Sequence, residues 1–290
     1  DRIIKSKNFI PGDLCSYGYW RCFDKSWKQS DFLSFGKFLD ENLKEFPQNK
    51  LTKISESEET KIKLGFLSSD IRRNHSVTYF LKTILSNYDQ DKFEIFLFMN
   101  HPKEDQTTKN FEDLVYKKIN IFKLGDIETL NKVRELKIDI MIDLMGYTSY
   151  QRLNLFKNRL AKKQIIWMGY CNTTGIKNMD YIISDPNVIK PEEEKFYSEK
   201  VIYLPEIWNC HCGFDFEREE HKPPLIKNDY FTFGSFNNFD KVNSDVIKVW
   251  SDILKKIKNS KLVLKTAKDI HATTRIKKIF HEKNVLDSIK

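Results

Sequence analysis

The stretch LGFLSSDIRRNHSVTYFL, residues 64–81, places ionisable side chains between two apolar segments. Ser68 and Asp70 follow a run that is typical of a buried strand, and His75 directly precedes an apolar helix face. With an ordinary pKa of about 6.5, a histidine can donate or accept a proton near neutral pH. Helix capping accounts for the same residues without chemistry, with Asn74 as the N-cap and His75 in the first helical turn. This loop alone does not decide between the two interpretations.

Three further apolar runs end in residues that suit a phosphorylated, sugar-like ligand. The residues at these ends are Gly146-Tyr147-Thr148, Gly169-Tyr170, and Asn238 with Lys241. Glycine lets the backbone approach a ligand closely, and hydroxyl and amide groups hydrogen-bond a sugar or a ribose. A lysine beside a helix N-terminus is suited to a phosphate. The pattern predicts a ligand-binding cleft between two lobes.

Short apolar runs alternate with amphipathic segments from residue 61 onward, which predicts an α/β fold with a largely parallel sheet. The expected strands are 62–68, 93–99, 120–123, 138–144, 164–168, 181–184 and 200–203, and the expected helices centre on 77–87, 107–117, 127–136 and 151–158. Because ligands bind where the carboxyl ends of parallel strands meet, we expect His75 and the two glycine-containing turns to converge at one edge of the sheet.

The chain divides by pattern into four segments. They are a helical lead-in or linker at 1–60, an N-terminal Rossmann-like lobe at 61–204, an interlobe connection at 205–229, and the start of a second lobe at 230–290. The last segment is expected to hold strands at 230–236 and 262–265 and helices at 244–258 and 270–283. Two strands and two helices bury too little surface for an α/β core, so we expect this lobe to be incomplete here. The chain does not begin with Met, so it is expected to belong to a longer protein.

Composition argues against several classes of protein. Apolar residues make up 40% of the 290 residues and aromatic residues 13%, which excludes the signature of a disordered chain. The net charge of +8 comes without an Arg-rich stripe and interleaved aromatics, so no nucleic-acid partner is expected. No apolar run is long enough for a bilayer, so we expect a cytoplasmic protein without a membrane partner. The Cys210-His211-Cys212 sequence lacks a second cysteine pair at zinc spacing, so no metal site is expected.

Six ordered blocks of sequence point to a family. They are KLGFLSSDIRRNHSVTYFL, DKFEIFLF, IDIMIDLMGYTSYQRLNLF, QIIWMGYCNTTGIKNMDYIISD, YSEKVIYLP and FGSFNNFDKVNSDVIKVWSDILKKIKNSKLVLK. In order and spacing they resemble the catalytic region of the O-linked N-acetylglucosamine transferases (glycosyltransferase family 41) and their SPINDLY-like bacterial relatives. The resemblance runs from about Lys61 to Lys265. It implies a two-lobed, Rossmann-like GT-B fold with a truncated second lobe, after a lead-in that joins it to helical TPR repeats.

The same resemblance implies an activity and roles for residues. The family moves a sugar from a UDP-sugar to a Ser or Thr hydroxyl of a protein, so the partners would be a UDP-sugar, with N-acetylglucosamine as the first choice, and protein acceptors. His75 matches an active-site histidine, and Lys241 matches the lysine that contacts the donor diphosphate. Gly169 and Tyr170 match the loop near the donor sugar, but Cys171-Asn172 replaces the usual Pro-Gly, which leaves the sugar preference open. We expect inversion without a metal cofactor and assign no Asp-X-Asp sequence to a metal.

Two other function classes remain open from the sequence. A nucleotide- or carbohydrate-binding module without catalysis would use the same strand-end loops, and UDP binding without sugar transfer by the full-length protein would favour it. A protein-interaction scaffold would instead rely on upstream helices. Recovery of many partners by residues 1–60 alone would favour the scaffold.

Overall fold

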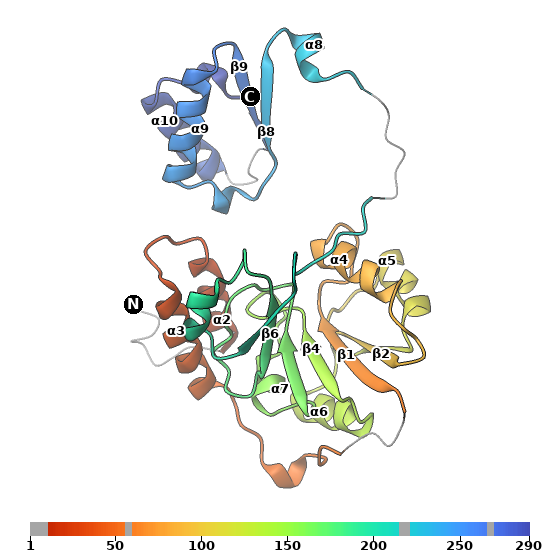
Figure 1. Cartoon of the computed structure of the whole chain (residues 1–290). Coiled ribbons are helices and arrows are strands. Elements are labelled where there is room, and N and C mark those ends of the chain that lie inside the picture. Colours follow the sequence, from red (N-terminus) through yellow and green to blue (C-terminus); the bar gives the residue numbers. More distant parts are fainter. Residues whose placement is uncertain (1–10, 56–59, 215–220, 266–269) are drawn as a thin grey trace. The chain divides into compact units, whose positions relative to one another are not determined.

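The computed structural model describes residues 11–55, 60–214, 221–265 and 270–290 (Figure 1). The chain forms two compact units, of which the first ends at Phe214 and the second continues to Lys290. This division differs from the four segments expected from the sequence, because the lead-in helices belong to the first unit rather than standing apart from it. Each unit is described separately below.

The first unit is built on a seven-stranded sheet in the order β3-β2-β1-β4-β5-β6-β7, with every pair of neighbours parallel (Figure 1). The strands are β1 (Ile62–Ser68), β2 (Phe93–Met99), β3 (Lys117–Asn120), β4 (Ile140–Asp143), β5 (Lys163–Ile166), β6 (Tyr181–Ser184) and β7 (Lys200–Tyr203). The chain moves outward from β1 to β3 on one side and from β4 to β7 on the other. The order therefore reverses between β1 and β4, and loops leaving these two strands in opposite directions open a crevice there.

Different helices cover the two faces of this sheet. They are α2 (Pro11–Arg21), α3 (Gln29–Asn42), α4 (Ser76–Leu85), α5 (Gln106–Asn110), α6 (Asp126–Glu135) and α7 (Leu153–Lys157), with 3-10 turns at Gln48–Lys50, Glu112–Leu114 and Pro191–Phe196. One apolar cluster joins α2, α3, α6 and α7 to Phe96 and Phe98 of β2, and another joins α4 to Ile95, Leu97 and Met99 of the same strand. Alternate residues of β2 thus point to opposite faces, and both faces are buried, as a parallel sheet requires.

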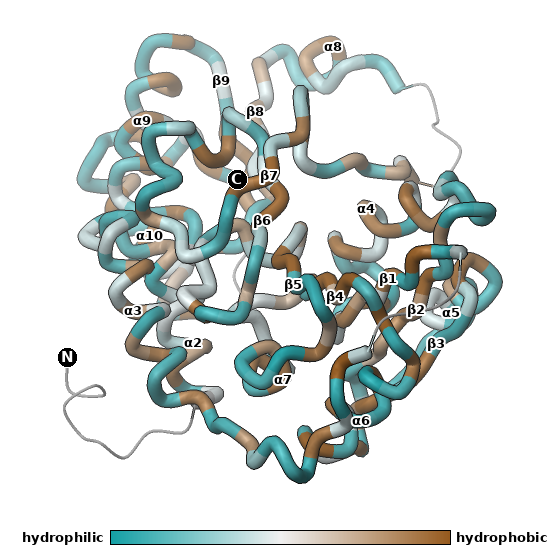
Figure 2. The backbone as a smooth tube through the Cα atoms, turned by 60° about the horizontal axis from the view of Figure 1, so that its bottom comes forward, coloured by the Kyte–Doolittle hydropathy of each residue, from teal (hydrophilic) through white to brown (hydrophobic). Residues whose placement is uncertain are grey.

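The second unit is smaller and carries its own apolar cluster. It contains α8 (Pro224–Asn228), β8 (Phe231–Ser235), a 3-10 turn at Phe239–Lys241, α9 (Ser244–Lys256), β9 (Ser260–Leu264), α10 (Ile270–Glu282) and a 3-10 turn at Leu286–Ser288. Strands β8 and β9 are parallel, and Ile247, Leu262 and Phe280 are buried between them and the helices. Helices α9 and α10 alternate between teal and brown along their length in Figure 2, as amphipathic helices do.

The sequence placed most of these elements, but two neighbouring expectations were wrong. The helix expected around 107–117 is the short α5 followed by a 3-10 turn at Glu112–Leu114. Strand β3 is Lys117–Asn120, not 120–123 as expected. This edge strand begins with two lysines, and Lys118 forms ion pairs with Glu104 and Glu112. Charged residues are common on edge strands, so this strand lacks the apolar pattern used to predict strands, and the prediction fell on the more apolar residues that follow it. Within the part of the chain that is described, no helix combines the length and apolar character needed to cross a membrane.

Candidate active site

A cavity of about 550 Å³ lies at the carboxyl ends of β1 and β4, where the strand order reverses. His75 lines it from the loop after β1, Tyr147 and Thr148 from the loop after β4, and Gly169 from the loop after β5. We call this cavity the crevice pocket. Four of the residues singled out from the sequence therefore meet in one place, because parallel strands deliver their following loops to the same edge of the sheet.

His75 is held as the N-cap of α4. Its backbone is extended (φ −103°, ψ 135°), and its Nδ1 accepts a hydrogen bond of 3.4 Å from Val77 N. The sequence-based assignment of Asn74 to this cap was wrong. Asn74, the residue before the cap, instead adopts a left-handed conformation (φ 61°), which asparagine tolerates better than most residues. This conformation directs the chain toward the helix. His75 is thus outside the first turn and faces the crevice pocket.

Asp70 lies beside the histidine and favours its charged form, against the effect of burial. Oδ1 of Asp70 is 3.4 Å from His75 Nε2, and the Asp70 backbone N–H donates to Ser68 Oγ at 3.0 Å. Because Nδ1 accepts a hydrogen bond, we infer that the proton of the neutral ring is on Nε2, toward Asp70. Burial lowers the pKa of His75, the Asp70 carboxylate opposes this, and Arg72 adds to the lowering. The imidazole is therefore neutral at pH 7.

A second buried carboxylate shapes the loop after β4. Asp143 is 1% exposed and accepts hydrogen bonds of 3.0 Å from Met145 N and Gly146 N. These bonds fold the turn that presents Tyr147 and Thr148 to the pocket. Burial raises the pKa of Asp143 to about 7, against the two backbone hydrogen bonds, and the charge of Asp70 adds to the increase. Protonation of this carboxyl near neutral pH therefore acts directly on the turn.

Two glycines in the pocket loops allow close backbone packing. A Cβ on Gly169 would lie 1.6 Å from the carbonyl oxygen of Leu144, and a Cβ on Gly146, whose φ is +53°, would lie 2.4 Å from Tyr170 Cβ. Neither position accepts a side chain without moving the backbone. The loops after β4 and β5 are therefore packed directly against each other behind the pocket.

Gly146 and Tyr170 do not line the crevice pocket, unlike the other predicted residues of these loops. Tyr170 is 4% exposed, and its ring stacks on that of Tyr147 with 4.8 Å between centroids. The expectation that Tyr170 meets the ligand is therefore replaced by a supporting role beneath Tyr147. A glycine-tyrosine pair at a strand end carries no signal that distinguishes a ring facing a ligand from one packed below the site.

Sequence reasoning missed one wall of the pocket, which α2 supplies. Gly12, Ser16, Tyr19 and Trp20 line it together with the strand-end loops. Their spacing of three and four residues places them on one helical face, which is a signal that was available. However, aromatic residues at helical spacing more often mark a face packed in the core, and only the 50% exposure of Trp20 reveals the difference.

Asn238 and Lys241 belong to the second unit. Lys241 N donates to the carbonyl of Asn238 at 3.0 Å in a 3-10 turn, and both side chains are exposed. Asn243 follows as the N-cap of α9, and its Oδ1 accepts from Asp245 N and Val246 N at 3.0 Å. Lys241 therefore precedes the N-cap of α9 by two residues.

Two sequences that could suggest metal chemistry have other structural roles. Asp89-Gln90-Asp91, an Asp-X-Asp sequence, lies in the turn before β2, at the opposite end of the strands from the pocket, where Asp89 pairs with Lys92 at 2.9 Å. The ring of His211 stacks on Tyr79 with 5.1 Å between centroids. Among the described residues, no three His, Cys, Asp or Glu side chains are grouped so that they could hold a metal ion.

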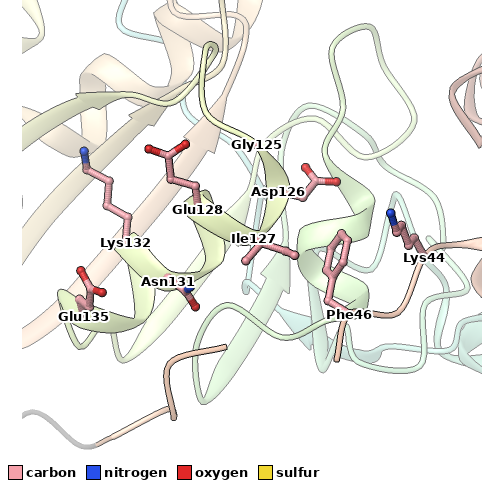
Figure 3. Close-up of a pocket in the computed structure, with 9 residues that line it drawn as sticks. All are labelled: Lys44, Phe46, Gly125, Asp126, Ile127, Glu128, Asn131, Lys132 and Glu135. Atoms are coloured by element: carbon pink, nitrogen blue, oxygen red, sulfur yellow. The ribbon is translucent and has the colours of Figure 1, made fainter. Parts of the chain in front are cut away.

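A larger cavity, of about 890 Å³, lies beside α6 on the first unit. Gly125, Glu128 and Lys132 line it from α6 and the residue before it, and Lys44 and Phe46 line it from the segment after α3 (Figure 3). We call it the α6 cavity. None of the residues predicted to bind a ligand lies in it.

Comparison with known proteins identifies the family. Residues 39–213 match the model of Glycosyl transferase family 41. SPINDLY of Arabidopsis thaliana, a probable UDP-N-acetylglucosamine–peptide N-acetylglucosaminyltransferase, is 34% identical over 211 residues, which cover 71% of this chain and 23% of SPINDLY. SEC of the same plant, with the same description, is 25% identical over 218 residues, covering 70% of this chain and 22% of SEC. The chain thus spans less than a quarter of the length of these relatives.

A solved structure shows the same fold. A mutant of the Thermobaculum terrenum O-GlcNAc transferase superposes with a TM-score of 0.85 and 20% identity, over 97% of this chain and 54% of that one. This likeness confirms the GT-B-type α/β fold expected from the sequence. By its family model, its relatives and its fold, the chain belongs to glycosyltransferase family 41.

Proposed function

We propose that the full-length protein is an inverting glycosyltransferase that moves a sugar from a UDP-sugar to Ser or Thr hydroxyls of protein acceptors. The observation that carries this proposal is the crevice pocket, in which His75 meets Tyr147, Thr148 and Gly169 in a chain of family 41. The names of SPINDLY and SEC support N-acetylglucosamine as the first choice of sugar.

In the proposed reaction the acceptor oxygen forms a bond to the anomeric carbon as the bond from that carbon to UDP breaks. The hydroxyl proton must leave the acceptor oxygen, and a neutral imidazole near the pocket can orient this hydroxyl or take the proton. The hydrogen bond from Val77 N to His75 Nδ1 is long at 3.4 Å, so this nitrogen can exchange it for a proton. The resulting imidazolium would lie beside the Asp70 carboxylate, which favours its charge.

We assign stabilisation of the departing diphosphate to Lys241, without a metal cofactor. The lysine is exposed and precedes the N-terminus of a 13-residue helix, α9, whose dipole favours an anion at that end. An ammonium group and a helix N-terminus acting on the same phosphate would stabilise the charge that develops as UDP leaves. Asn238, in the same turn, is proposed to contact the donor.

The test is a transfer assay with the full-length protein, labelled UDP-sugars and protein acceptors, in the presence of EDTA. We expect label on the acceptor and one UDP released per sugar. The Lys241→Ala variant should lose transfer by roughly a hundredfold or more, and Lys248→Ala, which removes an exposed lysine from α9 itself, should behave as wild type. UDP binding without transfer to any acceptor would contradict the proposal and favour a binding module.

A further inference from the structure

A buried carboxylate, for which the described residues supply no cationic partner, lies behind the crevice pocket, in the loop that precedes β7. Glu199 is 3% exposed. Its Oε2 accepts hydrogen bonds from the hydroxyls of Thr173 (2.7 Å) and Ser198 (3.0 Å). Its Oε1 accepts from Thr174 N (2.7 Å) and from the Thr174 hydroxyl. Four neutral donors thus compensate the desolvation of one buried charge, and they fix residues 173 and 174 relative to β7.

The pattern of donors requires a carboxylate at this position. Thr173 Oγ1 already accepts hydrogen bonds from Gly175 N (3.1 Å) and Ser198 N (3.2 Å), so both of its lone pairs are used. Its hydrogen must therefore be donated, and Glu199 Oε2 receives it. An amide NH₂ in place of this oxygen would face a hydroxyl that has no acceptor site left. Glutamine at position 199 therefore cannot reproduce the network, although it has the same shape.

The loop that Glu199 fixes also holds a wall of the pocket. The carbonyl oxygen of Thr174 accepts a hydrogen bond of 2.7 Å from the Tyr147 hydroxyl, and Tyr147 lines the crevice pocket. The loop has no room to move toward α3, because Gly175 (φ +68°) packs so closely on Gly36 that a Cβ would lie 2.2 Å from Gly36 Cα. Thr174 is therefore held on one side by Glu199 and on the other by a helix.

We propose that Glu199 is a positioning residue for the crevice pocket, acting through the Thr174 carbonyl and the Tyr147 hydroxyl. Glu199 does not line the pocket. Glu199 fixes the position of the Thr174 carbonyl oxygen. Through its hydrogen bond to the Tyr147 hydroxyl, this oxygen fixes the Tyr147 ring and the turn of residues 145–148. This inference rests on the proposed function only for the reaction, sugar transfer, that the positioned residues would support.

The test is a double-mutant cycle on the full-length protein with Glu199→Gln and Tyr147→Phe. Each single variant should lower kcat roughly three- to tenfold, the range that corresponds to one buried hydrogen bond, with the KM for the UDP-sugar changed less than twofold. If Glu199 acts through the Tyr147 hydroxyl, the double variant should be no slower than the slower single variant. Multiplying effects would overturn the proposal. A second pair of variants tests the Thr174 hydroxyl. Thr174→Val, which removes this hydroxyl, should lower kcat, and Thr174→Ser, which keeps it, should retain the wild-type kcat.

Asp180→Asn is the matched control for a merely structural role. Asp180 is at the far end of the same β5–β6 loop, where its carboxylate pairs with Arg159 at 2.9 Å and accepts from Gln164 N at 2.8 Å. It contacts neither Thr174 nor Tyr147, so its variant should lower the melting temperature and leave kcat within twofold of wild type. A drop in kcat equal to that of Glu199→Gln would show that any weakening of the loop slows transfer, and would overturn the proposal.

Hydrogen exchange separates this inference from the proposed function. Glu199→Gln and Tyr147→Phe should each increase amide exchange in residues 145–150 severalfold, and Asp180→Asn should not. Increased exchange in a protein that transfers no sugar would leave the positioning role standing and the proposed function contradicted. Active enzyme whose residues 145–150 exchange at the wild-type rate in Glu199→Gln would contradict the positioning role alone.

Discussion

The first unit contains two cavities, the crevice pocket of about 550 Å³ and the α6 cavity of about 890 Å³, and their side chains are held in different ways. Around the α6 cavity Glu128 and Lys132 are exposed, and a Cβ on Gly125 would meet no atom within 4 Å. At the crevice pocket Asp70 is buried beside His75, and Asp143, in the loop that supplies Tyr147, is buried and accepts hydrogen bonds from two backbone N–H groups.

The difference indicates that volume alone does not select the candidate site in this protein. A buried carboxylate costs free energy unless hydrogen bonds compensate it, whereas an exposed one keeps its hydration at no cost. The α6 cavity also has a held carboxylate, Asp126, which pairs with Arg152, but the crevice pocket has the more deeply buried carboxylates and lies where the strand order reverses. The comparison predicts that equivalent substitutions at the two cavities have unequal effects.

The largest difference in sugar transfer is expected between variants of the titratable residues His75, at the crevice pocket, and Glu128, at the α6 cavity. His75→Asn should lower sugar transfer roughly a hundredfold or more, because the imidazole is lost. Asparagine is among the best N-cap residues, so the helix cap and the melting temperature should be kept. Glu128→Gln at the α6 cavity should leave transfer within twofold of wild type. Comparable losses from the two variants would remove the distinction between the cavities.

The glycines provide the next comparison, in stability. Gly169→Ala should lower the free energy of unfolding by about 3 kcal/mol, because the new methyl group overlaps the Leu144 carbonyl. Gly125→Ala introduces the same group into open space, so its cost should come only from the weaker N-cap of α6 and stay at about 1 kcal/mol or less. Chemical denaturation of both variants measures the two values. A stable Gly169→Ala protein would show that the loops after β4 and β5 can separate.

The contrast between the cavities also shows what could be predicted from sequence. Strands β1, β2, β6 and β7 were placed to the residue. For β1 and β2 the reason is that apolar runs buried on both faces leave a strong pattern. The meeting of His75 with Tyr147, Thr148 and Gly169 followed from strand direction alone. Whether each side chain faces the pocket did not follow, since Tyr170 has the same composition signal as Tyr147 and packs beneath it.

Other features depend on contacts between segments that are distant in the sequence. The hydrogen bonds of Glu199 reach Thr174 and Thr173, which lie 25 and 26 positions earlier in the sequence, and no local sequence pattern predicts them. The pocket wall formed by α2 likewise depends on how α2 and α3 pack on the sheet. A helical pattern in the sequence shows that a helix has an apolar face, but not which element that face contacts. The sequence therefore predicted which loops meet at this edge of the sheet, and the structure was needed to separate residues that line the pocket from those packed behind it.

The pKa of Asp143 predicts a pH dependence of stability. The folded protein keeps a proton on this carboxyl up to about pH 7, whereas an unfolded Asp, with an ordinary pKa of 3.8, releases it in acid. Unfolding between these values releases a proton, so rising pH favours unfolding and this contribution to stability is lost by about pH 7. Asp143→Asn should remove a decrease on the order of 3 kcal/mol between pH 4 and 7. Denaturation of both proteins across this range measures the difference, and equal slopes would contradict the assignment.

The smallest effect should come from the two charges beside His75, and their variants should move the pH profile of transfer in opposite directions. The Asp70 carboxylate raises the pKa of His75 and Arg72 lowers it, while burial sets the overall decrease. Asp70→Asn should therefore shift the acid limb of kcat/KM to lower pH, and Arg72→Ala should shift it to higher pH. Each shift should be less than about one unit, because the Asp70 carboxylate is 3.4 Å from His75 Nε2 and the Arg72 side chain is 47% exposed. Asp70→Asn should also slow transfer a fewfold at pH 7, since the imidazolium formed during the reaction loses the charge beside it. Arg72→Ala has no such effect at pH 7, where His75 is already neutral. Shifts of both variants in the same direction would mean that the acid limb reports another group, and His75 would then no longer be the residue that takes the acceptor proton.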